Sequence, residues 1–129
     1  MEIARTPEDV FDFLTDVANL PRWQSGVHSA TQEGSRIHES RSMLGREFST
    51  TLEIEESERP RVFRIRALDG PIAFSVRHEL EPSGAGTRLT VVGEGDTGPL
   101  PGFAAGMMAR RAEKQFRKDF ERLKQLLEA

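Results

Sequence analysis

Hydrophobic and polar residues near the N-terminus follow a helical period. Thr6 precedes Pro7, Glu8 and Asp9, and this order is typical of a helix start, because the hydroxyl caps free N–H groups and acids favour the first turn. Apolar residues at helical spacing follow, and they predict a helix that ends at about Asp16. They are Val10, Phe11, Phe13, Leu14 and Val17.

A second short segment comes before Gly26. Pro21 interrupts the helical pattern, so residues 19–24 predict a turn or a short second helix. Trp23 is the only tryptophan of the chain, and we expect it to anchor this segment against the core.

From Val27 to Gly95 the period changes to two, which is typical of strands. Candidate strands cover residues 27–33, 35–43, 46–57, 61–69, 72–81 and 87–96. The separators are short and rich in Gly and Pro: Gly34, Leu44–Gly45, Glu58–Pro60, Asp69–Pro71 and Pro82–Gly86. Separators this short join neighbouring antiparallel strands, so the pattern predicts a meander.

Alternation also assigns the faces of the sheet. Along each strand, residues such as Arg64 and Arg66 point to solvent, and the residues that alternate with them point inward. The predicted inner face consists of Phe48, Thr50, Leu52, Ile54, Phe63, Ile65, Ala67, Ile72, Phe74, Val76, His78, Leu80, Thr87, Leu89, Val91, Gly93 and Gly95. Since this face is mainly apolar, another element has to cover it.

The final segment supplies the cover. After a Gly98–Gly102 loop, apolar residues recur at three and four positions to the chain end and predict one long amphipathic helix. They are Phe103, Met107, Met108, Ala112, Phe116, Phe120, Leu123 and Leu127. The C-terminal half offers bulky Phe and Leu, whereas residues 104–109 are Ala, Gly and Met. These fill space poorly, so we expect a gap there.

The predicted fold is α+β: a curved antiparallel sheet of six to seven strands around a long C-terminal helix, with two short helices near the N-terminus. Several segments in this order resemble the START-like (SRPBCC) superfamily with its helix-grip fold, in its bacterial polyketide cyclase/dehydrase-like branch. They are Thr6–Phe11, Leu20–Trp23, Met43–Arg46, Leu80–Pro82, Gly86–Leu89 and Asp119–Lys124. The resemblance covers residues 1–129 as a single domain, and it implies lipid carriers, plant allergens and aromatic cyclases as relatives.

The resemblance also implies a first strand of eight or more residues between the last strand and the second. Only Met1 to Arg5 precede the first helix here. We therefore expect a truncated first strand or a native start farther upstream, with the sheet weakened at one end.

Composition excludes several classes of protein. The chain has no cysteine, which excludes disulfides, thiolate metal sites and thiol chemistry. No apolar stretch is long enough to span a membrane, and no secretory signal opens the chain, so we expect a cytoplasmic protein without integral membrane association. Residues 110–124 carry seven basic residues against three acidic ones. We interpret them as the solvated side of the last helix rather than as a nucleic-acid site, because no aromatic platform accompanies them.

Inward residues near the expected gap are the candidate ligand-binding set. Each alone is typical of core packing, but together they predict an apolar cavity for a small molecule. The set is Trp23, Phe48, Phe63, Ile65, Phe74, Val76, His78, Leu89, Val91, Met107 and Met108.

His78 is the one titratable residue of this set. It is either a core histidine satisfied by a neighbour, or a catalytic acid/base or ligand donor suited to cyclisation or dehydration. His28 and His38 are expected on mixed strand faces, and no acidic residue lies at metal-ligand spacing with any of the three. We therefore expect no metal and no cofactor.

Glu39 and Arg41 share a strand face with Ile37 and Met43. One register turns the pair into the cavity, where its burial is costly unless it meets a polar ligand. The other register leaves the pair in water, and we favour this solvated alternative, although the sequence does not decide between the two.

Three functions are compatible with this pattern. The first is a module that binds a small hydrophobic molecule of the aromatic polyketide, lipid or isoprenoid type. The second is a cyclase or dehydratase in which His78 moves a proton. The third is a regulatory domain that binds another protein, and the chain is expected to be a monomer or a homodimer in each case.

Overall fold

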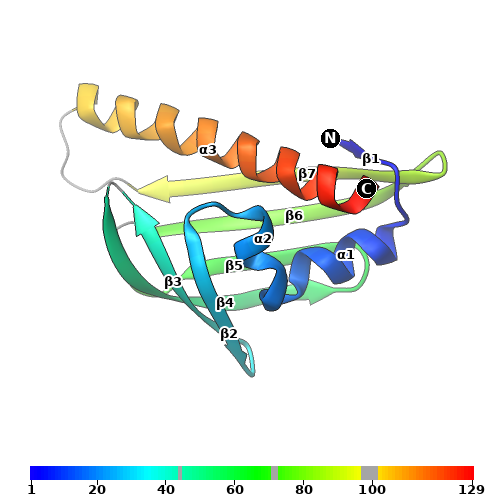
Figure 1. The fold of residues 1–129 in the computed structure, drawn as a ribbon, viewed down its shortest axis with the longest axis horizontal. Helices are drawn as coiled ribbons and strands as arrows, with labels where there is room; N and C mark the ends of the chain where they lie inside the picture. Colours follow the sequence, from blue (N-terminus) through cyan, green and yellow to red (C-terminus); the bar gives the residue numbers. More distant parts are fainter. Residues whose placement is uncertain (44, 71–72, 97–101) are drawn as a thin grey trace.

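The computed structural model describes residues 1–43, 45–70, 73–96 and 102–129. Its elements in chain order are β1 (Glu2–Ile3), α1 (Pro7–Thr15), η1 (Val17–Asn19), α2 (Leu20–Trp23), β2 (Val27–Glu33), β3 (Arg36–Met43), β4 (Arg46–Glu58), β5 (Val62–Ala67), β6 (Ala73–Ser83), β7 (Gly86–Asp96) and α3 (Gly102–Glu128). The strands form one antiparallel sheet in the order β1-β7-β6-β5-β4-β3-β2. The helices lie on its concave side (Figure 1), which confirms the predicted helix-grip fold.

The helical section begins where the sequence predicts. Thr6 Oγ1 accepts a hydrogen bond from the Asp9 N–H at 3.2 Å, and Pro7 is the first helical residue. The expected turn or short helix is the 3₁₀ turn η1 followed by α2. Trp23 is buried there, as predicted for an anchor.

The predicted strands agree with the observed ones to within two residues at nearly every end. β5 stops at Ala67, two residues early, because the chain turns there and Gly70 adopts a positive φ of 103°. Leu44, Pro71, Ile72, Gly98, Pro99, Leu100 and Pro101 lie outside the described residues.

The register places the predicted inward residues on one face. Residues directly opposite in an antiparallel pair share a side of the sheet. Such pairs include Ile37 with Leu52, Leu52 with Ala67, Ile65 with Val76, Phe63 with His78, and Leu80 with Leu89. The inner face predicted from alternation is thus observed across β3 to β7.

The first strand is short and has a single neighbour among the described strands. β1 pairs with β7 through Glu2 opposite Arg88 and Ile3 opposite Thr87. The expectation that it lies between the last strand and the second is wrong for these residues, because β2 forms the opposite edge of the sheet. Ile3 is nevertheless 1% exposed, so this short strand is tied into the core.

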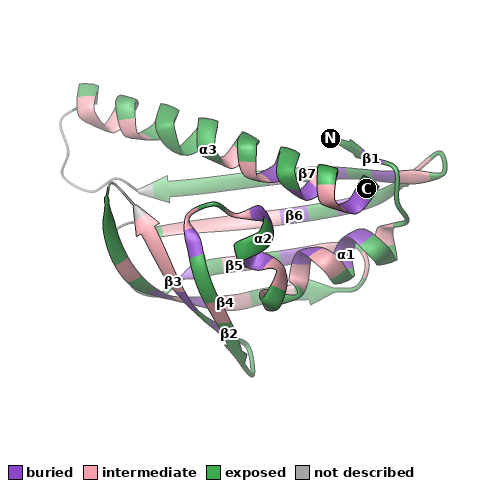
Figure 2. Ribbon diagram, in the orientation of Figure 1, coloured by how far each residue is buried: buried purple, intermediate pink, exposed green. Residues whose placement is uncertain are grey.

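Helix α3 is buried only toward its C-terminal end (Figure 2). Phe120, Leu123 and Leu127 are buried in the core with the apolar residues of α1 and α2. Phe103 is 78% exposed and Met107 is 59% exposed. The predicted apolar stripe therefore meets the core along half of the helix, and its N-terminal end extends into solvent.

The β6–β7 hairpin requires glycine where it meets β1. A Cβ added at Gly86 would collide with the Ile3 carbonyl oxygen, so Gly86→Ala should lower the free energy of unfolding by about 2 kcal/mol in urea denaturation. The control Gly106→Ala has no heavy atom within 4 Å of its new Cβ, and it should raise stability by up to about 1 kcal/mol as a helical substitution. Equal stability of Gly86→Ala and wild type would contradict the close approach of β1.

Candidate functional site

On β6 and β7, the inner face of the sheet loses its cover toward the end where α3 begins. On β7, Leu89 is buried, Val91 is half-buried and Gly93 is exposed. The same gradient runs along β6, from buried Leu80 to half-buried Phe74. We call the half-buried apolar part of the inner face the open face; it consists of Phe48, Ile54, Ile65, Phe74, Val76 and Val91.

The facing part of α3 carries side chains that are too small to close this space. The Phe116 ring lies 3.7 Å from the position that a Cβ on Gly93 of β7 would occupy. Nearer the N-terminus of the helix, Ala104, Ala105 and Met108 are half-buried. Apolar surface on both layers is thus partly uncovered, in the region where the sequence predicts a gap.

The candidate ligand-binding residues fall into three groups by burial. Trp23, Phe63, His78 and Leu89 are buried in the core. Phe48, Ile65, Phe74, Val76, Val91 and Met108 are half-buried, five of them on the open face and Met108 on α3. Met107 is mainly exposed, because it lies on the solvent side of a helix that leaves the core at this end.

Aromatic rings form a continuous layer beside the open face. Ring centroids are 5.1 Å apart for Trp23 and Phe120, 5.9 Å for Phe120 and His78, and 5.7 Å for His78 and Phe63. Phe116 joins the layer at 4.7 Å from Phe120. These rings are supplied by α2, α3, β5 and β6, so they fix the helices against the sheet where the open face begins.

His78 is held in this layer as a neutral imidazole. Its Nδ1 lies 2.8 Å from the Phe63 carbonyl oxygen, and since a carbonyl oxygen only accepts, Nδ1 carries the proton. Burial lowers the pKa of His78 to about 4, against a smaller opposing effect of the Phe63 carbonyl. Nε2 therefore bears a lone pair, and no described residue donates a hydrogen bond to it.

Glu39 and Arg41 lie on the inner face, so the solvated alternative favoured from the sequence is wrong. Glu39 pairs opposite Thr50 and Arg41 opposite Phe48, both on the inner side of β4. The Glu39 side chain is 1% exposed and that of Arg41 is 22% exposed. Arg41 Nε donates to Glu39 Oε1 at 2.8 Å, and an Arg41 Nη donates to Gln24 Oε1 at 2.8 Å.

Two buried polar atoms of this region have no hydrogen-bond partner among the described residues. They are Glu39 Oε2, an acceptor, and Trp23 Nε1, a donor. Sequence reasoning placed Trp23 in the site for its apolar ring and missed Gln24 and Thr50 as polar members. The position of Gln24 directly after Trp23 was the one available signal for its role.

The other histidines lie away from the open face. His28 Nε2 is 2.5 Å from Ser42 Oγ, and His38 Nδ1 is 3.4 Å from Thr51 Oγ1, both at exposed positions. Over residues 1–43, 45–70, 73–96 and 102–129, His, Asp and Glu side chains form no cluster that could hold a metal ion. In the same ranges no helix combines the length and the apolar character that crossing a membrane requires.

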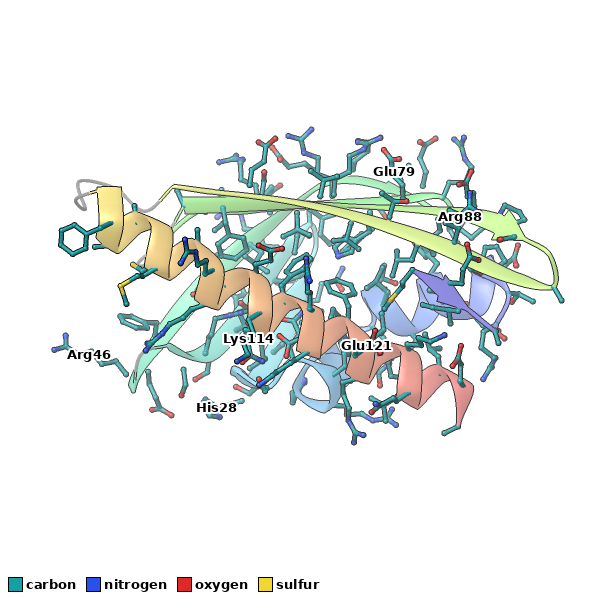
Figure 3. All side chains as sticks on the ribbon, turned by 90° about the horizontal axis from the view of Figure 1, so that it is seen from above. His28, Arg46, Glu79, Arg88, Lys114 and Glu121 are labelled. Carbon is teal, nitrogen blue, oxygen red and sulfur yellow. The ribbon has the colours of Figure 1, made fainter. Side chains whose placement is uncertain are left out.

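A shallow depression of about 280 Å³ lies on the opposite side of the sheet. It is lined by Arg61, Val62, Glu79, Leu80, Glu81 and Thr90. Figure 3 shows Glu79 and Arg88 on this side, away from α3, where Arg77 pairs with Glu79 and Arg88 with Glu81. Charged residues in water dominate this surface, so it is a poor site for an apolar molecule.

Comparison with known proteins agrees with this architecture. No match was found among curated proteins. A conserved protein from Geobacillus kaustophilus is 16% identical, with a TM-score of 0.81 over 98% of this chain and 91% of that chain. A protein from Thermus thermophilus is 22% identical, with a TM-score of 0.73 over 99% of this chain and 90% of that chain.

A third similar structure is the di-domain ARO/CYC BexL from the BE-7585A biosynthetic pathway. It is 21% identical, with a TM-score of 0.76, over 97% of this chain and 43% of that chain. Identities this low establish a shared fold. The family model described as polyketide cyclase / dehydrase and lipid transport matches residues 1–128. The chain therefore belongs to the polyketide cyclase/dehydrase and lipid transport family, a START-like (SRPBCC) family with the helix-grip fold.

Proposed function

We propose that this protein binds a small hydrophobic molecule between the open face of the sheet and the N-terminal half of α3. The observation that carries the proposal is the loss of burial along the inner face of β6 and β7, where Phe74, Val76 and Val91 are half-buried while His78, Leu80 and Leu89 of the same two strands are buried. Apolar surface left in contact with water is costly, at roughly 25 cal/mol per Å². A bound apolar molecule removes this surface from water.

The family match supports the same use of the fold. Its description joins polyketide cyclases and dehydrases with lipid transport, and both activities handle molecules with much apolar surface. BexL, named as an ARO/CYC, is a relative in fold at the enzymatic end of this range. We therefore propose a ligand of the aromatic polyketide, lipid or isoprenoid type.

His78 fits a structural or ligand-binding role better than proton transfer. An imidazole with a pKa of about 4 is neutral at pH 7, so it lacks the acidic proton of an imidazolium and is a weak base. Its Nδ1–H is already engaged by Phe63. Binding without covalent change is accordingly the function that we favour over a cyclase reaction at His78.

Filling the open face should block binding. Val91 points to the inner face and its neighbour Val92 is 54% exposed on the outer face, so the two valines form a matched pair. Val91→Trp should weaken binding of the uncharged fluorescent probe N-phenyl-1-naphthylamine by at least about ten-fold, because the indole occupies the space of the probe. Val92→Trp should bind it as the wild type does. Unchanged binding by a folded Val91→Trp variant, measured by fluorescence titration, would reject the site.

The burial of His78 should make stability depend on pH. The unfolded chain takes up a proton near the ordinary pKa of 6.5, whereas the folded chain does so only near 4. Between these values the unfolded state binds more protons, so the free energy of unfolding should fall by about 2 kcal/mol from pH 7 to pH 5.

His78→Asn should remove most of this slope in urea denaturation, while exposed His38→Asn should retain it. Hydrogen bonds from Arg88, Arg59 and Lys124 lower the pKa of Glu2, Asp12 and Glu128, respectively, below the ordinary values of 4.5, 3.8 and 4.5. These carboxylates therefore change the free energy of unfolding only at a pH below the range tested here. An equal slope in His78→Asn and wild type would show that His78 is not held neutral by burial.

A further inference from the structure

The Glu39–Arg41 pair is a charged group that the fold has buried and only partly satisfied. One carboxylate oxygen of Glu39 accepts from Arg41 at 2.8 Å, and the other oxygen has no partner among the described residues. Leaving an acceptor of a buried carboxylate unpaired is unfavourable, because the oxygen has given up water without a replacement. Such a cost at one position of an inner face points to a donor that comes from outside the chain.

The position of the pair supports this interpretation. Glu39 lies opposite Thr50, and Arg41 lies opposite Phe48, which belongs to the open face. Arg41 is further fixed by Gln24, the residue after Trp23, whose indole N–H also lacks a partner among the described residues. The two polar atoms without partners, Glu39 Oε2 and Trp23 Nε1, therefore lie beside the proposed apolar site. Their residues are linked, because Gln24 follows Trp23 and accepts a hydrogen bond from Arg41, which also donates to Glu39.

The charges restrict what the donor can be. Glu39 and Arg41 together carry no net charge, and His78 on the same face is neutral. The other inward side chains among the described residues of β5 to β7 are apolar, glycine or threonine, while β4 adds the exposed Arg46 at its first position and Ser57 opposite Phe63. Arg41 is already paired with Glu39, so a charged ligand at this pair would lose its hydration without gaining a counter-ion, whereas a hydroxyl group loses little and supplies the missing hydrogen.

We propose that Glu39 and Arg41 form the polar end of the ligand site and select an uncharged apolar ligand whose hydroxyl donates a hydrogen bond to Glu39 Oε2. This inference rests on the function proposed above and gives it a chemical class: alcohols and phenols rather than fatty acids or other anions. The competing occupant is an ordered water molecule that satisfies the same oxygen. If such a water molecule stays in place, ligands of the same shape should bind with equal affinity whether or not they carry a hydroxyl group.

A set of naphthalene compounds of nearly one size tests the proposal in the unmodified protein. The compounds are 2-naphthol, naphthalene, 2-methoxynaphthalene and 2-naphthoate, titrated by calorimetry and by displacement of N-phenyl-1-naphthylamine at pH 7. We expect 2-naphthol to bind at least about ten-fold more tightly than naphthalene or the methoxy compound, because a hydrogen bond to a charged acceptor has that effect. We expect 2-naphthoate to bind most weakly.

Variants assign the preference to Glu39. Glu39→Gln should reduce the advantage of 2-naphthol over 2-methoxynaphthalene to less than about three-fold, because the amide can turn its N–H₂ toward the ligand. The exposed Glu47→Gln, whose side chain is 75% exposed, is the matched control and should keep the wild-type preference. If Glu39→Gln fails to fold because Arg41 is left uncompensated, the double variant Glu39→Gln/Arg41→Gln replaces it.

The outcomes separate this inference from the proposed function. Equal affinity for naphthol, naphthalene and the methoxy compound, with binding still lost in Val91→Trp, would overturn the hydroxyl selection and leave the apolar site intact. Tightest binding of naphthoate would also overturn it. If neither the probe nor any of the naphthalene compounds bound, both proposals would fail.

Discussion

The uneven distribution of side-chain volume along α3 is the constraint on which this structure depends. A protein interior is packed to the density of an organic crystal, and a surface is closed only if the facing element brings enough volume to it. Phe120, Leu123 and Leu127 bring that volume to one end of the sheet and are buried. Residues 104–109 are Ala, Gly and Met, so the same rigid rod that closes one end leaves the other partly open. The aromatic layer marks the boundary between the two regions.

Two buried polar groups on the inner face show different solutions to the same problem. His78 becomes neutral and uses its one proton on the Phe63 carbonyl, so its burial costs little at neutral pH. Glu39 instead keeps a charged partner, Arg41, and leaves one oxygen without a donor among the described residues. The one N–H of the first group is thus satisfied within the protein. The second is complete only with a group that the described residues do not supply, which is why the proposed chemistry depends on Glu39 rather than on His78.

The sequence was sufficient for the fold because its signals are periodic. The cap at Thr6, the alternation along β4 and the spacing of Phe116, Phe120, Leu123 and Leu127 each reflect local geometry, and the structure agrees with them. The pairing of β1 was misjudged, because two residues carry no register information of their own. The open end of α3 was predicted from side-chain size, but the exposure of Phe103 and Met107 was not, since an amphipathic stripe does not tell where the sheet beneath it ends.

The polar part of the proposed site could not be predicted from the sequence, because it depends on strand register. A one-residue change of register reverses every side chain on a strand, so Glu39 and Arg41 were inward in one register and in water in the other. Pairing with β4 decides the matter. The role of Gln24 depends on its hydrogen bond with Arg41 of β3, a contact between distant segments that no linear pattern contains.

The central claim is that the open face holds a small molecule, and native mass spectrometry of the protein purified gently from its natural host tests it most directly. The account predicts a complex heavier than the chain by the mass of one organic molecule, which is released as an uncharged compound when the protein is unfolded in organic solvent. Detection of the bare chain alone, from cells in which the protein is functional, would contradict it.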